Sequence, residues 1–368
     1  MNSWIKGKFS LKYLLIAVLI LMLGFIVVEF TKMIQPVPYY QEQLEAAKLM
    51  KDCLAVIKEE RLKRNLPIDL EIDPNQTGII GEEYTRLTTT LGNLSAKRTS
   101  TNPAFAALMV KYFKEITLKK GDTVAIGSSG SFPSLALATL CAVKVLDLKP
   151  VLIYSIGSSE YGATLPEYTF VQMLEDLNKK NLLLYQLSAI SMGGFLDQAE
   201  GMFYPDSQET IYQIAYASGV YFINIENVEE NIKKRMTIYS EGAQGEPIKA
   251  FINIGGATPN YGNTPASITY PNGLVVKGPK IPNHPERGLI FEYQNLGIPV
   301  IHLLNIRDLA VKNGLPIDPV PLPEIGEGNV YSQISYQKST IVLVLGIEFL
   351  YLFWVWKRNV YKKEKKLS

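Results

Sequence analysis

The chain has 368 residues, of which 47% are hydrophobic and 20% are charged, and its formal net charge at pH 7 is +2. This balance gives no electrostatic signature of a nucleic-acid-binding protein, and the length allows one sizeable folded domain. With only two histidines and two cysteines, a zinc site of the usual ligand count is not expected, nor is any other cofactor. The sequence does not decide whether Cys53 and Cys141 pair.

The first apolar run covers residues 13–28 and follows Lys6, Lys8 and Lys12. As a helix it measures about 24 Å, close to a hydrocarbon core of about 30 Å. The residues at 29–32, Glu-Phe-Thr-Lys, do not resemble a signal-peptide cleavage site. We therefore expect a cytoplasmic tail over residues 1–12 and a retained transmembrane helix over residues 13–30.

A second apolar run, residues 339–356, is followed by a basic tail at 357–368. The Lys/Arg excess at both ends predicts two cytoplasmic termini, with the middle of the chain outside the cytoplasmic membrane. Glu348 lies inside the second run, where an ionisable side chain costs about 2.5–3.5 kcal/mol on insertion scales. We expect Glu348 to contact another membrane subunit, although a protonated, unpaired carboxyl is the alternative.

The segment 31–65 opens with a stiff Pro-Val-Pro break at 36–38 and continues as a predicted helix at 40–65. Its apolar residues recur at helical spacing and form one face. The stripe is short for a coiled coil, so it predicts a stalk helix that packs on its own domain.

The next segment, 66–330, is the expected extracytoplasmic domain. It is expected to be an α/β domain because short apolar runs alternate with helical stretches. Near-continuous apolar strands of this kind predict a doubly wound, Rossmann-like and mostly parallel sheet. The predicted strands cover residues 123–126, 150–154, 183–190, 220–225, 248–254 and 299–304, and the predicted helices 133–146, 166–180, 207–218, 227–239 and 285–295.

Four of the predicted strands end in small, hydroxyl-rich turns. In a doubly wound sheet the carboxyl ends of strands surround the ligand crevice, so these turns are candidate ligand-binding elements. Their residues are Gly127, Ser128, Ser129, Gly130, Ser131, Gly157, Ser158, Ser159, Gly193, Gly194, Gly255 and Gly256.

The turn at 127–131 precedes Pro133, which suits the first turn of a helix, so its N–H groups are predicted to face an anion. The turn matches neither a nucleotide-binding nor a hydrolase signature, and a carboxylate is the favoured anion. Lys97 and Arg98 are further candidates, although a surface loop would also carry such a pair. The long loop at 255–285 suggests a lid or a partner surface, or simply a mobile connection.

Five stretches carry a resemblance to the membrane-anchored poly-gamma-glutamate system protein family: 73–83 (DPNQTGIIGEE), 88–92 (TTTLG), 96–103 (AKRTSTNP), 130–133 (GSFP) and 154–162 (YSIGSSEYG). The resemblance covers roughly residues 65–260. It implies a part in bacterial synthesis or export of the capsule polymer poly-γ-glutamate, but it implies no catalytic residue.

Two functions are compatible with these observations. In the favoured one, an accessory subunit binds poly-γ-glutamate or another polycarboxylate while its anchors dock onto membrane-embedded synthase or export subunits. The alternative is a hydrolase or transferase of γ-glutamyl amide bonds, with Ser129 or Ser131 as nucleophile and His284 as base. His302 lies in an apolar strand, where a core histidine is expected, so the general base is poorly supported.

Overall fold

The computed structural model describes residues 11–364, which separate into two units. One unit is Pro38–Tyr331, and the other combines the two ends of the described chain, up to Val37 and from Ser332 onward. The larger unit therefore begins earlier than the expected position 66. It does so because helix α2 (Tyr40–Lys63) buries Met50, Cys53 and Ile57 in the core of this unit.

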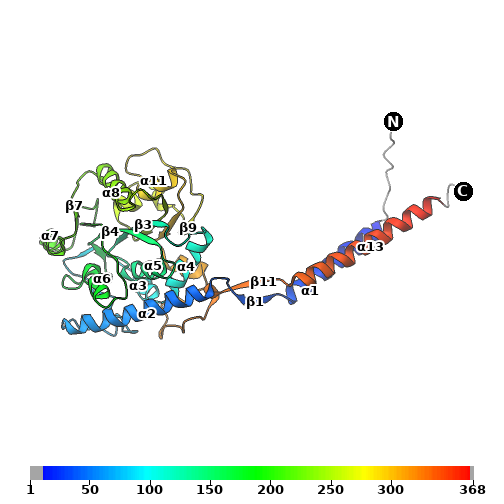
Figure 1. The fold of residues 1–368 in the computed structure, drawn as a ribbon, viewed down its shortest axis with the longest axis horizontal. Helices are drawn as coiled ribbons and strands as arrows, with labels where there is room; N and C mark the ends of the chain where they lie inside the picture. The colour runs from blue at the N-terminus through cyan, green and yellow to red at the C-terminus, as the bar shows by residue number, and fades with distance from the viewer. Residues whose placement is uncertain (1–10, 365–368) are drawn as a thin grey trace. The chain divides into compact units, whose positions relative to one another are not determined.

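The larger unit is mixed α/β (Figure 1). It is built on a seven-stranded sheet in the order β7-β6-β4-β3-β8-β10-β9. All neighbouring strands run parallel except β9, which pairs antiparallel with β10. Strands β4, β6 and β7 lie on one side of β3, whereas β8 and the strands that follow it in the chain lie on the other side, so the strand order reverses between β3 and β8. The strands are β3 (Thr123–Ser129), β4 (Lys149–Ser155), β6 (Ala189–Ser191), β7 (Phe222–Ile223), β8 (Ile248–Ile254), β9 (Gly273–Val275) and β10 (Val300–Leu303).

Helices cover both faces of this sheet because successive side chains of a strand point to opposite faces. Val124 and Ile126 of β3 belong to one core cluster, together with residues of α2, α4 (Ala104–Glu115), α5 (Pro133–Val145) and α6 (Phe170–Lys179). Ala125 belongs to a second cluster with α8 (Val228–Gly242) and α11 (Leu289–Asn295). Cys53 and Cys141 are buried free thiols in the first cluster.

Several predicted elements are shorter in the structure. Only the end of the predicted strand at 183–190 pairs with β4, as part of β6. Leu184, near the start of the predicted strand, is 67% exposed. Helix α6 begins later than position 166, since Thr169 and Gln172 form a capping box that fixes its start. The loop at 255–285 contains helices α9 (Thr258–Tyr261) and α10 (Pro265–Ile268) as well as strand β9.

A small parallel sheet, absent from the sequence-based prediction, joins β2 (Thr88–Thr90) to β5 (Ser158–Ser159). Strand β2 leads into α3 (Leu94–Ser100), whose first turn is capped by the side chain of Asn93. The pairing therefore holds α3 beside the turn that follows β4. The remaining elements of this unit are α7 (Ser207–Ser218), α12 (Ile306–Lys312) and η1 (Asn329–Tyr331).

The second unit contains α1 (Leu11–Phe30) and α13 (Lys338–Glu364), both long and apolar enough to span a membrane. The two helices pack side by side (Figure 1). Helix α1 is followed by β1 (Met33–Pro36), α13 is preceded by β11 (Ser332–Ser335), and these two strands pair antiparallel. Glu348 is only 7% exposed, so its side chain is buried where α13 meets α1. The predicted tails extend into residues 1–10 and 365–368, which lie outside the described residues.

Candidate ligand cleft

A cleft of about 800 Å³ lies at the carboxyl ends of the central strands. It is lined by residues that follow β3, β4, β6 and β8, together with residues from β2, α3 and the start of α12. The reversal of strand order between β3 and β8 falls at this place. Open parallel sheets bind their ligands at such a switch point.

The structure brings eight of the fourteen predicted ligand-binding residues to the cleft wall. They are Lys97, Ser129, Ser131, Gly157, Ser159, Gly193, Gly194 and Gly256. The other six do not line the cleft: Gly127, Ser128, Gly130, Ser158, Gly255 and Arg98. Gly127 and Ser128 are residues of β3 itself, because that strand continues three residues beyond its predicted end.

Gly130 does not offer its N–H to an anion, contrary to the sequence-based prediction. Its N–H donates to the backbone carbonyls of Ser155, at 2.9 Å, and Gly157, at 3.2 Å. A Cβ at this position would lie 2.6 Å from the carbonyl oxygen of Ile156, closer than atoms can approach. Glycine is therefore needed here for the close packing of two turns.

Arg98 points away from the cleft and braces a neighbouring loop. Its guanidinium donates to the backbone carbonyls of Glu71 and Ile72 and forms an ion pair with Asp318 at 3.4 Å. The guanidinium donors that suggested a carboxylate site thus find their partners within the chain itself.

Lys97 is the charged side chain at the centre of the site. It is 3% exposed, and its Nζ donates to the carbonyl of Ser131 and to Oγ of Ser159, the latter at 2.7 Å. The same nitrogen lies 4.1 Å from the ring centroid of Phe132. Its polar partners within residues 11–364 are these two oxygens, and neither belongs to a carboxylate. Burial lowers the pKa of Lys97 to about 7, although nearby Glu160 opposes this shift.

The remaining charges of the cleft wall are Arg307 and Glu200, both exposed. Arg307 makes no ion pair or side-chain hydrogen bond within residues 11–364. The buried Oγ of Ser129, a second polar atom of the wall, has no hydrogen-bond partner within the described part of the chain. The wall therefore combines cationic groups and hydroxyls with unused hydrogen-bonding capacity.

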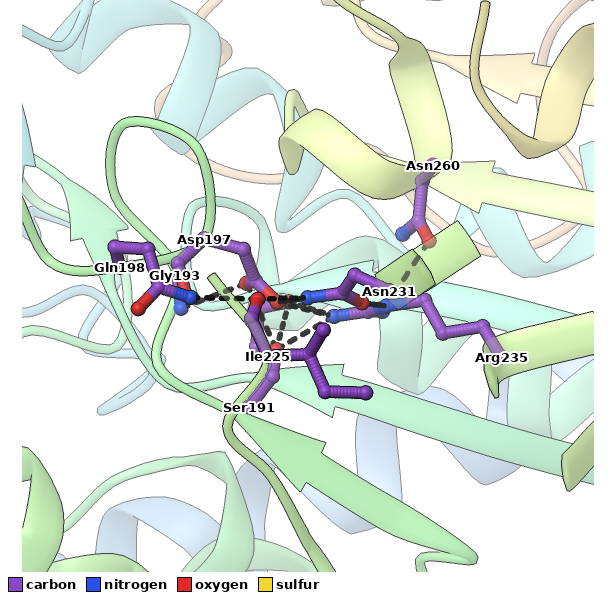
Figure 2. A network of polar contacts seen from close by, with 9 residues as sticks. Ser191, Gly193, Asp197, Gln198, Ile225, Asn231, Arg235 and Asn260 are labelled. Carbon is purple, nitrogen blue, oxygen red and sulfur yellow. Dashed lines mark hydrogen bonds and ion pairs between the residues drawn. The ribbon is translucent and has the colours of Figure 1, made fainter. Parts of the chain in front are cut away.

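A buried polar network supports the turn at Gly193 (Figure 2). Asp197 accepts hydrogen bonds from the Gly193 N–H at 2.9 Å and from the Ser191 hydroxyl at 2.8 Å. Its other carboxylate oxygen accepts from Asn231 at 3.0 Å and from Arg235 at 2.8 Å. The network fixes the backbone of one cleft wall without itself lining the cleft.

Neither histidine lines the cleft. His284 lies in a separate surface hollow with Arg287 and Glu292. His302 is buried, its Nδ1 is 2.9 Å from the Asn253 amide nitrogen, and burial lowers its pKa to about 4. The proposed base His284 is thus not placed beside Ser129 or Ser131, which is a correction to the hydrolase hypothesis.

The sequence-based prediction missed several residues of the wall. These residues come from β2 and its connection to α3, from the loop after Gly194 and from the start of α12: Thr89, Thr90, Leu91, Gly92, Asn93, Phe195, Glu200, Gly201, Asn305, Ile306 and Arg307. Strands of two or three residues carry no readable periodicity, so no strand was predicted at residues 88–90. Arg307 could have been predicted as a residue of the wall, because it lies just after the last predicted strand.

No protein-family model matches this sequence, and no curated protein matches it. Among solved structures, chloroplast FtsY from Physcomitrella patens aligns with 11% identity and a TM-score of 0.15, over 84% of this chain and 99% of that chain. A TM-score of that size supports no inference about fold or function.

Proposed function

We propose that this protein is a membrane-anchored accessory subunit of poly-γ-glutamate synthesis or export, and that its cleft binds the polymer through carboxylate groups. The observation that carries the proposal is the buried Lys97 amine, which has no carboxylate partner among the described residues and lies in a cleft at the strand switch point. Placing an anion against such a cation would compensate for its loss of water.

The rest of the cleft suits a polycarboxylate. Arg307 adds a cation at the exposed part of the wall, and Ser129 and Ser131 contribute hydroxyl groups. A volume of about 800 Å³ is in the range of small-molecule sites, so a short stretch of polymer would fit. The resemblance to the poly-gamma-glutamate system family supplies the choice of polymer.

The membrane part of the proposal rests on α1 and α13. With the Lys/Arg excess near both ends of the chain, we assign cytoplasmic termini, an extracytoplasmic domain and a bacterial cytoplasmic-membrane location. Reporter fusions after Lys120 and after Ser368 test this assignment. A cytoplasmic signal from the Lys120 fusion would contradict it.

Binding is tested with the full chain in detergent and a fluorescent γ-linked glutamate oligomer. Gly256→Leu is the sharpest variant, because a Cβ at Gly256 would meet only Leu304, at 3.7 Å, so a side chain can extend into the cleft. We expect Gly256→Leu and Arg307→Glu each to weaken binding about tenfold or more, which is about 1.4 kcal/mol.

The matched control is Lys249→Glu. Lys249 is exposed and lies near the amino end of β8, at the opposite edge of the sheet from the cleft. This variant should bind like the parent protein, and binding by the parent should weaken with added salt. Equal binding by Gly256→Leu and the parent would place the polymer outside the cleft.

A further inference from the structure

The hydroxyl of Ser159 has one hydrogen-bond partner among the described residues, the amine of Lys97 at 2.7 Å. Both residues line the cleft, and Ser159 is partly exposed whereas Lys97 is 3% exposed. A ligand in the cleft can therefore reach the serine oxygen, while the lysine is shielded from bulk water. This arrangement is that of a nucleophile beside a buried base.

Both residues are held in place by contacts that do not involve the ligand, Ser159 through its backbone and Lys97 through its side chain. The Ser159 N–H donates to Oγ of Ser131 at 3.0 Å, and Ser159 pairs with Thr90 across the small sheet. Lys97 is held by the Ser131 carbonyl and by the ring of Phe132. Such support from neighbouring groups keeps a nucleophile and its base in a fixed relative position.

We propose that Ser159 and Lys97 form a serine–lysine catalytic pair that cleaves an amide bond of the carboxylate-bearing ligand. The inference rests on the proposed function for the class of ligand, and it replaces the bases considered from the sequence. A neutral lysine can keep one N–H on the Ser131 carbonyl and turn its lone pair toward the Ser159 hydroxyl. Burial lowers the pKa of Lys97 to about 7, so near pH 7 both forms are populated: the ammonium that attracts a carboxylate and the neutral amine that acts as the base.

The chemical steps balance with water as the second substrate. Oγ of Ser159 attacks the amide carbonyl carbon, and its proton passes to Nζ of Lys97. The carbon–nitrogen bond then breaks, Lys97 returns the proton to the leaving amine, and an ester to Ser159 remains. Water attacks this ester and gives a proton to Lys97, which passes it back to Ser159 as the carboxylic acid leaves.

The test uses the full chain in detergent and a fluorophosphonate probe, in which the serine oxygen bonds to phosphorus and fluoride leaves. We expect labelling at Ser159, located by mass spectrometry, with a rate that rises as the pH passes about 7, since the neutral amine of Lys97 is the base. Ser159→Ala should abolish it. Lys97→Arg keeps a cation and donors but cannot supply a neutral base, so labelling should fall about 100-fold or more.

Lys119→Met and Ser218→Ala are matched controls because neither residue lines the cleft, and both variants should label like the parent. Thermal unfolding shows whether Lys97→Arg is folded; if it is not, the same comparison uses Lys97→Met. In parallel, poly-γ-glutamate chain length is followed by size-exclusion chromatography. The parent should shorten the polymer, and Ser159→Ala should bind it without shortening it.

The outcomes separate this inference from the proposed function. If the parent binds the polymer but neither shortens it nor reacts with the probe, or if folded Lys97→Arg labels at the parent rate, the catalytic pair is refuted while the binding role stands. If the probe labels Ser159 in a Lys97-dependent way but the polymer does not bind, the pair stands and the assigned ligand is refuted.

Discussion

Arg235 and Asp197 form an ion pair in which both side chains are 0% exposed, with Nη2 2.8 Å from Oδ2. The two residues lie on α8 and on the turn after β6, and Asp197 also holds the Gly193 N–H. The pair thus connects a helix packed on one sheet face to the wall of the cleft. Because water is excluded, each charge is compensated by the other and by the hydrogen bonds of the surrounding network.

We predict that Asp197→Ala lowers the free energy of unfolding by about 3–5 kcal/mol, because the buried guanidinium of Arg235 loses its counter-ion. Chemical unfolding followed by circular dichroism measures this loss. The exposed pair Lys233–Glu229, also on α8, is the control, and Lys233→Ala should change stability little. Similar effects of the two substitutions would show that the buried pair does not stabilise the fold.

His302 makes stability depend on pH. Burial lowers its pKa to about 4 in the folded protein, whereas an unfolded histidine titrates near 6.5. Between these values the unfolded state binds more protons, so stability is lost as the pH falls from about 6.5 to about 4, by up to about 3 kcal/mol. His302→Gln should remove this part of the pH dependence. Parallel stability curves for the variant and the parent would contradict the prediction.

Helices α1 and α13 approach closely at Gly24. A Cβ at Gly24 would lie 2.3 Å from Cγ1 of Val344, whereas one at Gly346 would meet nothing within 4 Å. We therefore predict that Gly24→Cys combined with Val344→Cys forms a disulfide on mild oxidation, seen as altered mobility on a non-reducing gel. Gly24→Cys with Gly346→Cys is the control. Equal trapping of both pairs would mean that the helices do not keep this contact.

Glu348 is buried between these two helices, and its Oε2 has no hydrogen-bond partner within the described residues. We predict that Glu348→Leu still inserts, because it removes an unfavourable group from the membrane interior. If the carboxyl also contacts another subunit, as we propose, the variant will co-purify less with membrane partners and yield less polymer. Normal assembly and output by the variant would refute that contact.

Much of the sheet could be predicted because its signals are local. Neighbouring residues alone identify the apolar runs that form β8 and β10 and the proline at the start of α5, Pro133. The same holds for α1 and α13, whose apolar lengths alone match a membrane core. The grouping of hydroxyl-rich turns also followed from the rule that parallel strands end at one edge.

The tertiary structure decided which of those residues serve the cleft. Lys97 meets Ser159 across 62 residues through two strands too short to show a pattern, and Arg98, its neighbour, turns to a different loop. Asp197 and Arg235 likewise pair across 38 residues. The sequence determined the longer elements because periodicity is local. Strand register and side-chain direction, which depend on packing across the chain, determined the short strands and the site.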